Sequence, residues 1–150
     1  IGPRRELKRA LEAFWQGEID EAALRAAGAA LRRQNWEAQR AAGVDLLPAG
    51  DFAWYDHVLT ASAMFGNVPQ RFGPAPGRGV DLQTYFAMAR GAAGAPALEM
   101  TKWFDTNYHY LVPEFDAGTR WRLDAAWLID EVREAQALGM PVKPVVLGPL

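Results

Sequence analysis

Two segments of the chain repeat one order of elements, and this repeat limits what the chain can fold into. In each, a helical pattern ends at a glycine and an apolar run follows: the helical patterns cover residues 21–42 and 124–138, the glycines are Gly43 and Gly139, and the apolar runs are 44–48 and 140–147. Glycine often caps a helix C-terminus, and a short apolar run bounded by turn residues is typical of a buried strand. The repeat therefore predicts two parallel strands, each preceded by a helix.

Apolar residues at spacings of three and four mark the helices, because such residues share one helix face. Residues 4–15 carry this pattern at Leu7, Leu11, Phe14 and Trp15; residues 21–42 carry it at Leu24, Ala27, Leu31 and Ala38; and the last helix carries it at Leu128, Val132, Ala135 and Leu138. Asp124 is suited to cap the start of that last helix. Residues 51–65 are also expected to be helical. Residues 69–79, which contain three prolines and three glycines, predict an irregular loop.

Repeated helix-to-strand units joined by glycine-containing turns are typical of α/β proteins. Pro141 and Pro144 must lie at the edge or start of the last strand, because proline cannot donate to a sheet ladder. A closed (β/α)8 TIM-type barrel needs about 250 residues, so residues 1–150 predict an incomplete barrel. The chain starts at Ile1 and stops in an apolar run, and we expect both ends to be cut from a longer protein. An open doubly wound sheet is the alternative, but no Gly-x-Gly-x-x-Gly turn follows a strand.

The charge balance argues against several classes of partner. Sixteen Lys and Arg face 18 Asp and Glu, without a basic block, so neither nucleic acid nor an anionic membrane surface is an expected partner. No apolar run approaches the roughly 18 residues of a membrane span, and no secretory leader is recognisable. A cytoplasmic location is therefore expected. The absence of cysteine excludes disulfides and thiolate ligands within the chain.

Arg4, Arg5, Lys8 and Arg9 concentrate positive charge at the start of the first predicted helix. Arg5 and Lys8 are three residues apart, so both would project from one helix face and grip a single anionic group. A solvated basic surface is the plainer interpretation. However, each cation at a helix N-terminus opposes the helix dipole by roughly a few tenths of a kcal/mol, and a bound polyanion would offset that cost.

Residues 99–110 (EMTKWFDTNYHY) combine four aromatic side chains with polar ones, among them Lys102, Asp105, Thr106 and Asn107. Aromatic rings supply contact area and polar groups supply direction, which suits the wall of a binding site. An aromatic core edge beside a polar turn explains the same residues. Lys102 either extends to water or meets an anion.

Asp56 and His57 are neighbours, which suggests a catalytic triad. Adjacent residues on a helix do not face each other, however, and no serine in a nucleophile elbow accompanies them. A buried, hydrogen-bonded role is therefore expected for His57. Since His57 and His109 are the only histidines and cysteine is absent, a zinc site of nitrogen and sulfur ligands is not expected within this chain.

Four blocks occur in order along the chain: residues 2–8 (GPRRELK), 51–59 (DFAWYDHVL), 66–69 (GNVP) and 99–110, with LGP at 147–149. Together they closely resemble successive blocks of the cobalamin-independent methionine synthase family. The resemblance implies two (β/α)8 barrels that face each other across the active site. Residues 1–150 would form the N-terminal part of the N-terminal barrel, which binds the folate tail, and the catalytic C-terminal barrel would be absent from the chain.

The resemblance also implies a reaction. Members of the family that this chain resembles move a methyl group from 5-methyltetrahydropteroyltri-L-glutamate to L-homocysteine, giving L-methionine without cobalamin. Zinc, held by His, Glu and two Cys of the C-terminal barrel, would lower the pKa of the substrate thiol. None of those ligands lies in this chain, so no catalytic or metal-binding residue is expected here and the chain alone is expected to be inactive.

For this chain, the resemblance implies binding of the folate triglutamate by six residues: Arg5, Glu6, Leu7, Lys8, Lys102 and Asn107. Glu6 would orient Arg5 or Lys8, and Leu7 would contribute through its backbone or packing. Several carboxylates along a tail need several cations, so the residue types point the same way. The alternative is a catalytically inactive, stand-alone binding or interaction domain on the same scaffold. A longer reading frame with the downstream His, Glu and two Cys would decide for the enzyme.

Overall fold

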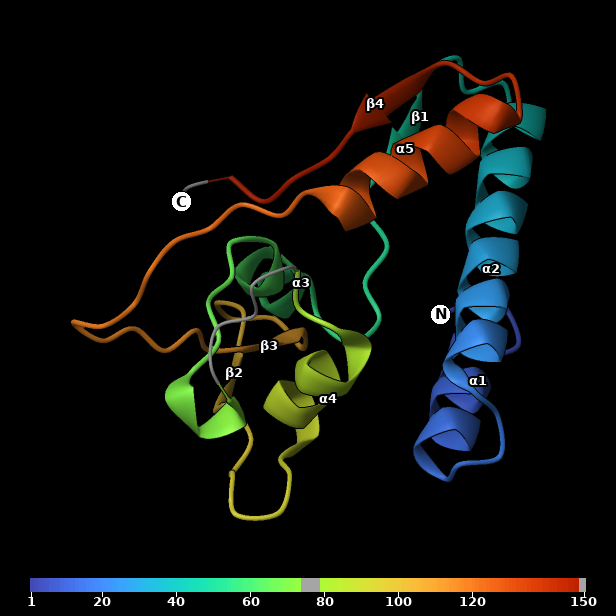
Figure 1. Ribbon diagram of the computed structural model, residues 1–150. Coiled ribbons are helices and arrows are strands. Elements are labelled where there is room, and N and C mark those ends of the chain that lie inside the picture. The colour runs from blue at the N-terminus through green and yellow to red at the C-terminus, as the bar shows by residue number, and fades with distance from the viewer. Residues whose placement is uncertain (74–78, 149–150) are drawn as a thin grey trace. The chain divides into compact units, whose positions relative to one another are not determined.

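The structure is a computed structural model that describes residues 1–73 and 79–148 (Figure 1). The chain divides into two compact units. The first comprises residues 1–49 and 131–144, and the second comprises residues 50–130 together with the described residues that follow Pro144. Helix α5 (Ala126–Ala137) contributes residues to both units.

Two helices open the first unit and pack side by side (Figure 1). Helix α1 spans Glu6–Trp15 and helix α2 spans Glu21–Ala41; the leucines buried along them are Leu7, Leu11, Leu24 and Leu31. Asp20 caps α2, since its carboxylate accepts a hydrogen bond from the Ala23 N–H at 2.8 Å. Both predicted helices are confirmed, but α1 starts two residues later than predicted. Arg5 is in the left-handed region, with φ of 61°, and therefore lies outside the helix.

The two predicted strands pair in parallel, as the repeat requires. Strand β1 (Leu47–Ala49) lies beside β4 (Val142–Pro144), with Leu47 opposite Val142. Both are shorter than the apolar runs that predicted them. Pro141 precedes β4 and Pro144 ends it, as expected for residues without an N–H, and the Pro141 carbonyl accepts a hydrogen bond from Leu47 at 2.9 Å.

The core of the first unit joins this strand pair to helices α2 and α5. It consists of buried residues from four segments: Trp36, Leu47, Ala49, Ala135 and Met140. The indole N–H of Trp36 donates to the Pro48 carbonyl at 2.7 Å. Beside the core, the buried Arg32 guanidinium donates two hydrogen bonds of 2.8 and 2.7 Å to the Glu134 carboxylate. The helix-to-strand units are thus fixed by both apolar contact and a bidentate ion pair.

The second unit combines short helices with a hairpin. Its elements are α3 (His57–Met64), the 3-10 helix η1 (Gln70–Phe72), α4 (Leu82–Arg90), β2 (Met100–Lys102) and β3 (His109–Leu111), the two strands pairing antiparallel. The helix predicted for 51–65 is wrong for residues 51–56, because the Asp56 carboxylate accepts from the Leu59 N–H at 2.8 Å and so starts α3 at His57. Of the loop predicted at 69–79, residues 74–78 lie outside the described residues, as does the proline of the 147–149 block.

These elements confirm a mixed α/β fold. The sheets found among the described residues are the parallel pair β1–β4 and the hairpin β2–β3. In the same part of the chain, no helix has both the length and the apolar character needed to cross a bilayer.

Candidate functional site

The basic residues before α1 lie on a tight turn. The Arg5 N–H donates to the Gly2 carbonyl and the Leu7 N–H donates to the Ile1 carbonyl, both at 3.1 Å. Gly2 has φ of 84°, and a Cβ placed on it would lie 2.2 Å from Oε2 of Glu6. The turn therefore requires glycine at position 2 for its backbone and for the space beside Glu6.

Glu6 is committed to the turn that precedes it. Its carboxylate accepts from the Arg4 backbone N–H at 3.0 Å and from the Arg4 guanidinium Nε at 3.2 Å. The pKa of Glu6 is lowered from its ordinary value, chiefly by the hydrogen bond from its own backbone N–H and further by Arg4. Desolvation raises the pKa, but by less than these effects lower it. The expectation that Glu6 orients Arg5 or Lys8 is therefore wrong, because the turn folds Arg4 back onto this carboxylate.

The basic residues of this turn differ in how far they are already paired. Lys8 lies 3.6 Å from the Glu12 carboxylate, and Arg9 donates to the Arg4 carbonyl at 2.7 Å. The Arg5 side chain is exposed and has no hydrogen bond or ion pair within residues 1–73 and 79–148. Arg5 is thus the cation that is most open to an external anion. Because Arg5 precedes the helix, its predicted alignment with Lys8 on one helix face is wrong.

The Leu7 side chain is buried, and its N–H is already bound to the Ile1 carbonyl.

We expect Gly2→Ala to destabilise the protein more than Gly17→Ala. Both glycines have positive φ, but a Cβ at Gly17 would meet no atom within 4 Å. Gly17→Ala should therefore lower the free energy of unfolding by about 1 kcal/mol through backbone strain alone. Gly2→Ala should lower it by at least about 1 kcal/mol more, since it also displaces the Glu6 carboxylate. Urea denaturation measures both, and equal losses would contradict the role assigned to this turn.

The second group of predicted residues lies on the β2–β3 hairpin. Met100 pairs with Leu111 and Lys102 pairs with His109. The turn between the strands is closed by the Trp103 N–H, which donates to the Tyr108 carbonyl at 2.7 Å. Thr106 closes it further, since its hydroxyl donates to the Trp103 carbonyl at 2.6 Å. The hairpin presents its polar side chains to solvent: Lys102, Asp105, Thr106 and Asn107 are all exposed.

Lys102 and Asn107 are available to a ligand. In the part of the chain that the structure describes, neither the Lys102 ammonium nor the Asn107 carboxamide has a hydrogen-bond or ion-pair partner. Lys102 is also the only Lys or Arg in residues 99–111. The structure therefore places Arg5, Glu6, Leu7 and Lys8 at one turn of the first unit, and Lys102 and Asn107 on one hairpin of the second.

A buried polar network holds the hairpin, and the sequence did not reveal it. The Asp56 carboxylate is buried and accepts hydrogen bonds from the Tyr108 hydroxyl at 2.5 Å, the Leu59 N–H at 2.8 Å and the Leu111 N–H at 3.3 Å. Tyr85, also buried, donates to the Asp56 carbonyl at 3.2 Å. The available signal was an aspartate directly before an apolar helical run, which indicates an N-cap. The buried position predicted for His57 is wrong, since that side chain is only half-buried.

Both phenols of this network stay protonated at neutral pH. Burial raises the pKa of Tyr85 to about 12. Burial first, and then the hydrogen bond to Asp56, raise the pKa of Tyr108 to about 12. Tyr108 is therefore a hydrogen-bond donor to Asp56 throughout the physiological range.

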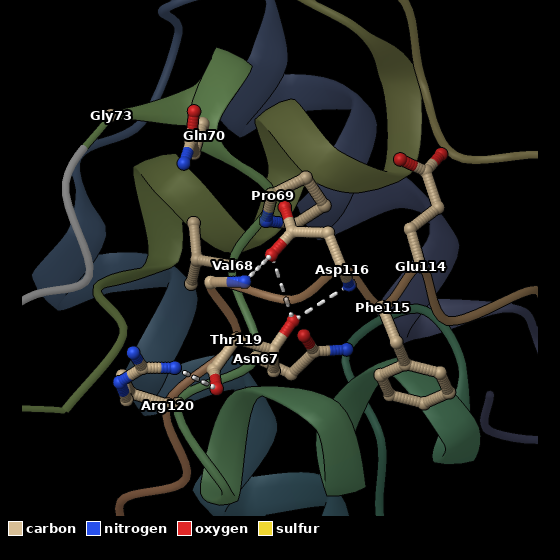
Figure 2. Close-up of a pocket in the computed structure, with 12 residues that line it drawn as sticks. Asn67, Val68, Pro69, Gln70, Gly73, Glu114, Phe115, Asp116, Thr119 and Arg120 are labelled. Carbon is tan, nitrogen blue, oxygen red and sulfur yellow. Dashed lines mark hydrogen bonds between the residues drawn. The ribbon is translucent and has the colours of Figure 1, made fainter.

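A pocket of about 560 Å³ lies elsewhere in the second unit, and Figure 2 shows its lining. Asp116 accepts from the Gly118 N–H at 2.7 Å, and Arg120 donates to the Thr119 carbonyl at 3.1 Å. Glu114 accepts a hydrogen bond from Arg71 at 2.8 Å, and this bond lowers the pKa of Glu114. Two carboxylates and one guanidinium line the pocket, so it does not favour a polyanion. Residues 66–69, one of the blocks that carry the family resemblance, belong to its lining, but none of the six predicted folate-binding residues does.

The residues present do not fit a zinc centre of the kind that the family resemblance implies. The chain has no cysteine. Among residues 1–73 and 79–148, no group of three or more His, Asp and Glu side chains is arranged to hold a metal ion.

Comparison with known proteins supports the family resemblance over the whole length of the chain. Residues 1–150 match the family described as "Cobalamin-independent synthase, N-terminal domain". Proteins from two strains of Acidithiobacillus ferrooxidans, each named 5-methyltetrahydropteroyltriglutamate–homocysteine methyltransferase, are 55% identical over 150 residues, which is all of this chain. The chain spans 19% of the length of these relatives. The chain therefore belongs to the family of the cobalamin-independent synthase N-terminal domain.

Proposed function

We propose that this chain is part of a methyltransferase that moves a methyl group from 5-methyltetrahydropteroyltri-L-glutamate to L-homocysteine, and that it binds the polyglutamate tail. The observation that carries the proposal is the availability of exposed cations in the predicted positions. Arg5 and Lys102 are exposed and have no partner among the described residues. The names of the relatives support the substrate, because they specify a pteroyl triglutamate and homocysteine.

The chemistry of the tail matches these side chains. Each added glutamate brings a carboxylate that is ionised at neutral pH. A guanidinium such as that of Arg5 can bind a carboxylate through two parallel hydrogen bonds, whereas the Lys102 ammonium acts as a point charge with three donors. Lys8 is expected to contribute less, because it is already 3.6 Å from Glu12. Asn107 can supply a neutral donor and acceptor beside Tyr108.

The proposal extends to the protein around this chain. Residues 1–150 would form the N-terminal part of a (β/α)8 barrel, a scaffold that the parallel pairing of β1 with β4 supports. Homocysteine and zinc would be bound by a C-terminal barrel of the longer protein, where zinc would supply thiol activation. The protein would act in the cytoplasm, without cobalamin.

Replacing Arg5 by alanine tests the proposal in the intact protein. We expect the dissociation constant of the triglutamate folate to rise by about 5- to 10-fold, because a charge-assisted hydrogen bond is lost while Lys8 and Arg9 partly compensate. Binding of the monoglutamate folate should change by less than about 2-fold. Isothermal titration calorimetry measures both constants.

Arg33→Ala is the matched control, since Arg33 is an exposed arginine on α2 outside the basic turn. It should leave both affinities within about 2-fold of the wild-type values. Equal losses for the two variants, or equal losses for the two ligands, would refute the assignment of Arg5 to the tail.

A further inference from the structure

A single buried carboxylate connects helix α3 to the β2–β3 hairpin of the second unit. Through Oδ2, Asp56 accepts from the Leu59 N–H in the first turn of α3 and from the Leu111 N–H in β3. Through Oδ1, it accepts from the Tyr108 hydroxyl at 2.5 Å. Asp56 is 4% exposed, so these three donors take the place of water around its charge.

Tyr108 transmits this attachment to both proposed ligand contacts on the hairpin. Asn107 directly precedes Tyr108 in the chain. The Tyr108 carbonyl accepts from the Trp103 N–H at 2.7 Å, and Trp103 directly follows Lys102. The Tyr108 side chain is therefore bound to Asp56, while its backbone closes the turn that carries Lys102 and Asn107.

The hairpin needs such an attachment. Each of its strands has three residues, and an isolated two-stranded hairpin is at best marginally stable in water. Residues 104–108 between the strands are exposed, and Phe104 at the turn is in the left-handed region, with φ of 50°, and is 83% exposed. Ladder hydrogen bonds and local packing alone would therefore leave the turn free to change conformation.

We infer that Asp56 and Tyr108 are positioning residues that hold the β2–β3 hairpin in the conformation in which Lys102 and Asn107 meet the ligand. The inference rests on the proposed function of the hairpin. Neither residue needs to touch the ligand through its side chain. Their effect on affinity comes from preorganisation, because a hairpin held in its binding conformation loses less entropy when the ligand binds.

Tyr108→Phe in the intact protein tests this inference. The substitution removes one hydroxyl and keeps the ring, whose centroid lies 6.4 Å from that of Trp103. We expect the dissociation constant of the triglutamate folate to rise by about 3- to 10-fold, and the Trp103 N–H to exchange with solvent several-fold faster. Calorimetry and amide exchange measure the two effects, and the exchange is measured without ligand.

Tyr85→Phe is the matched control, because the Tyr85 hydroxyl belongs to the same network but contacts residues before and within α3. It bonds to Thr60 at 3.0 Å, accepts from the Tyr55 N–H at 3.2 Å and donates to the Asp56 backbone carbonyl at 3.2 Å, so it does not bond to the Asp56 carboxylate that holds Tyr108. Among the described residues, it makes no hydrogen bond to the hairpin. Since Tyr85 is fully buried, removing its hydroxyl should lower the urea midpoint more than Tyr108→Phe does. It should nevertheless leave triglutamate affinity within about 2-fold.

The result that supports the inference is a separation of stability from affinity. Tyr108→Phe should be less destabilised than Tyr85→Phe and yet bind the triglutamate folate less well. Wild-type affinity and wild-type Trp103 exchange in Tyr108→Phe would overturn it, as would an equal loss of affinity in Tyr85→Phe, which would reduce the effect to general destabilisation. If Lys102→Ala leaves triglutamate affinity unchanged, the proposed function of the hairpin fails. Faster Trp103 exchange in Tyr108→Phe would still show that Tyr108 holds the hairpin.

Discussion

Replacing Trp36 by alanine is expected to lower the free energy of unfolding by about 3–5 kcal/mol. Trp36 is 3% exposed and packs among Leu47, Ala49, Ala135 and Met140. The substitution would leave a cavity in the core that joins α2 to the β1–β4 pair. It would also remove the 2.7 Å hydrogen bond that the indole N–H donates to the carbonyl of Pro48, the middle residue of β1. Urea denaturation followed by circular dichroism measures the loss.

Trp121→Ala provides a control with the same chemical change at an open position. Trp121 is 62% exposed, and its ring contacts that of Phe115 at a centroid distance of 5.4 Å. Since little apolar surface is returned to water, the free energy of unfolding should fall by less than about 1 kcal/mol. Comparable losses for the two variants would contradict the position of the core at Trp36.

Features set by neighbours in sequence were predicted well. The α1 and α2 helices follow from leucines at spacings of three and four, and the glycine at position 43 ends the second helical pattern where its φ of 84° permits a turn. The parallel partnership of β1 and β4 follows from the repeat of one helix-to-strand unit. Such signals are local or repeated, so one sequence is enough to find them.

Features set by distant partners were not predicted. Tyr108 and Asp56 are separated by 52 positions, and no spacing rule connects them. Without that contact, residues 51–56 look like the start of a helix, and the aromatic residues of 99–110 look equally like a core edge or a site wall. The left-handed Arg5 depends on the turn that Gly2 makes against Glu6, which helix periodicity cannot show.

For the candidate site, the residue types predicted anion binding, and the family resemblance predicted which residues would take part. The structure adds which cations are already engaged. Arg4 is bound to Glu6 and Lys8 is near Glu12, whereas Arg5 and Lys102 have no partner among the residues whose positions are described. For the basic turn, this difference could not be obtained from the sequence, because Glu6 and Glu12 lie within the same charged segment as Arg4, Arg5, Lys8 and Arg9.

Lys102→Ala is expected to have the largest effect on ligand binding. The dissociation constant of the triglutamate folate should rise by about 10- to 100-fold, since a charge-assisted contact is lost. No other Lys or Arg lies in residues 99–111 to compensate, in contrast to the basic turn around Arg5. Lys143→Ala, at an exposed lysine in β4, is the matched control and should change the constant by less than about 2-fold.

The most direct test measures affinity against tail length in the intact protein. Methyltetrahydropteroyl ligands with one, two and three glutamates are titrated into the wild type and into Lys102→Ala. We expect wild-type affinity to increase with each added glutamate, and Lys102→Ala to lose most of that increase while binding the monoglutamate almost normally. A wild-type affinity that does not depend on tail length, or an equal loss for all three ligands in Lys102→Ala, would contradict the assignment of this chain to the polyglutamate tail.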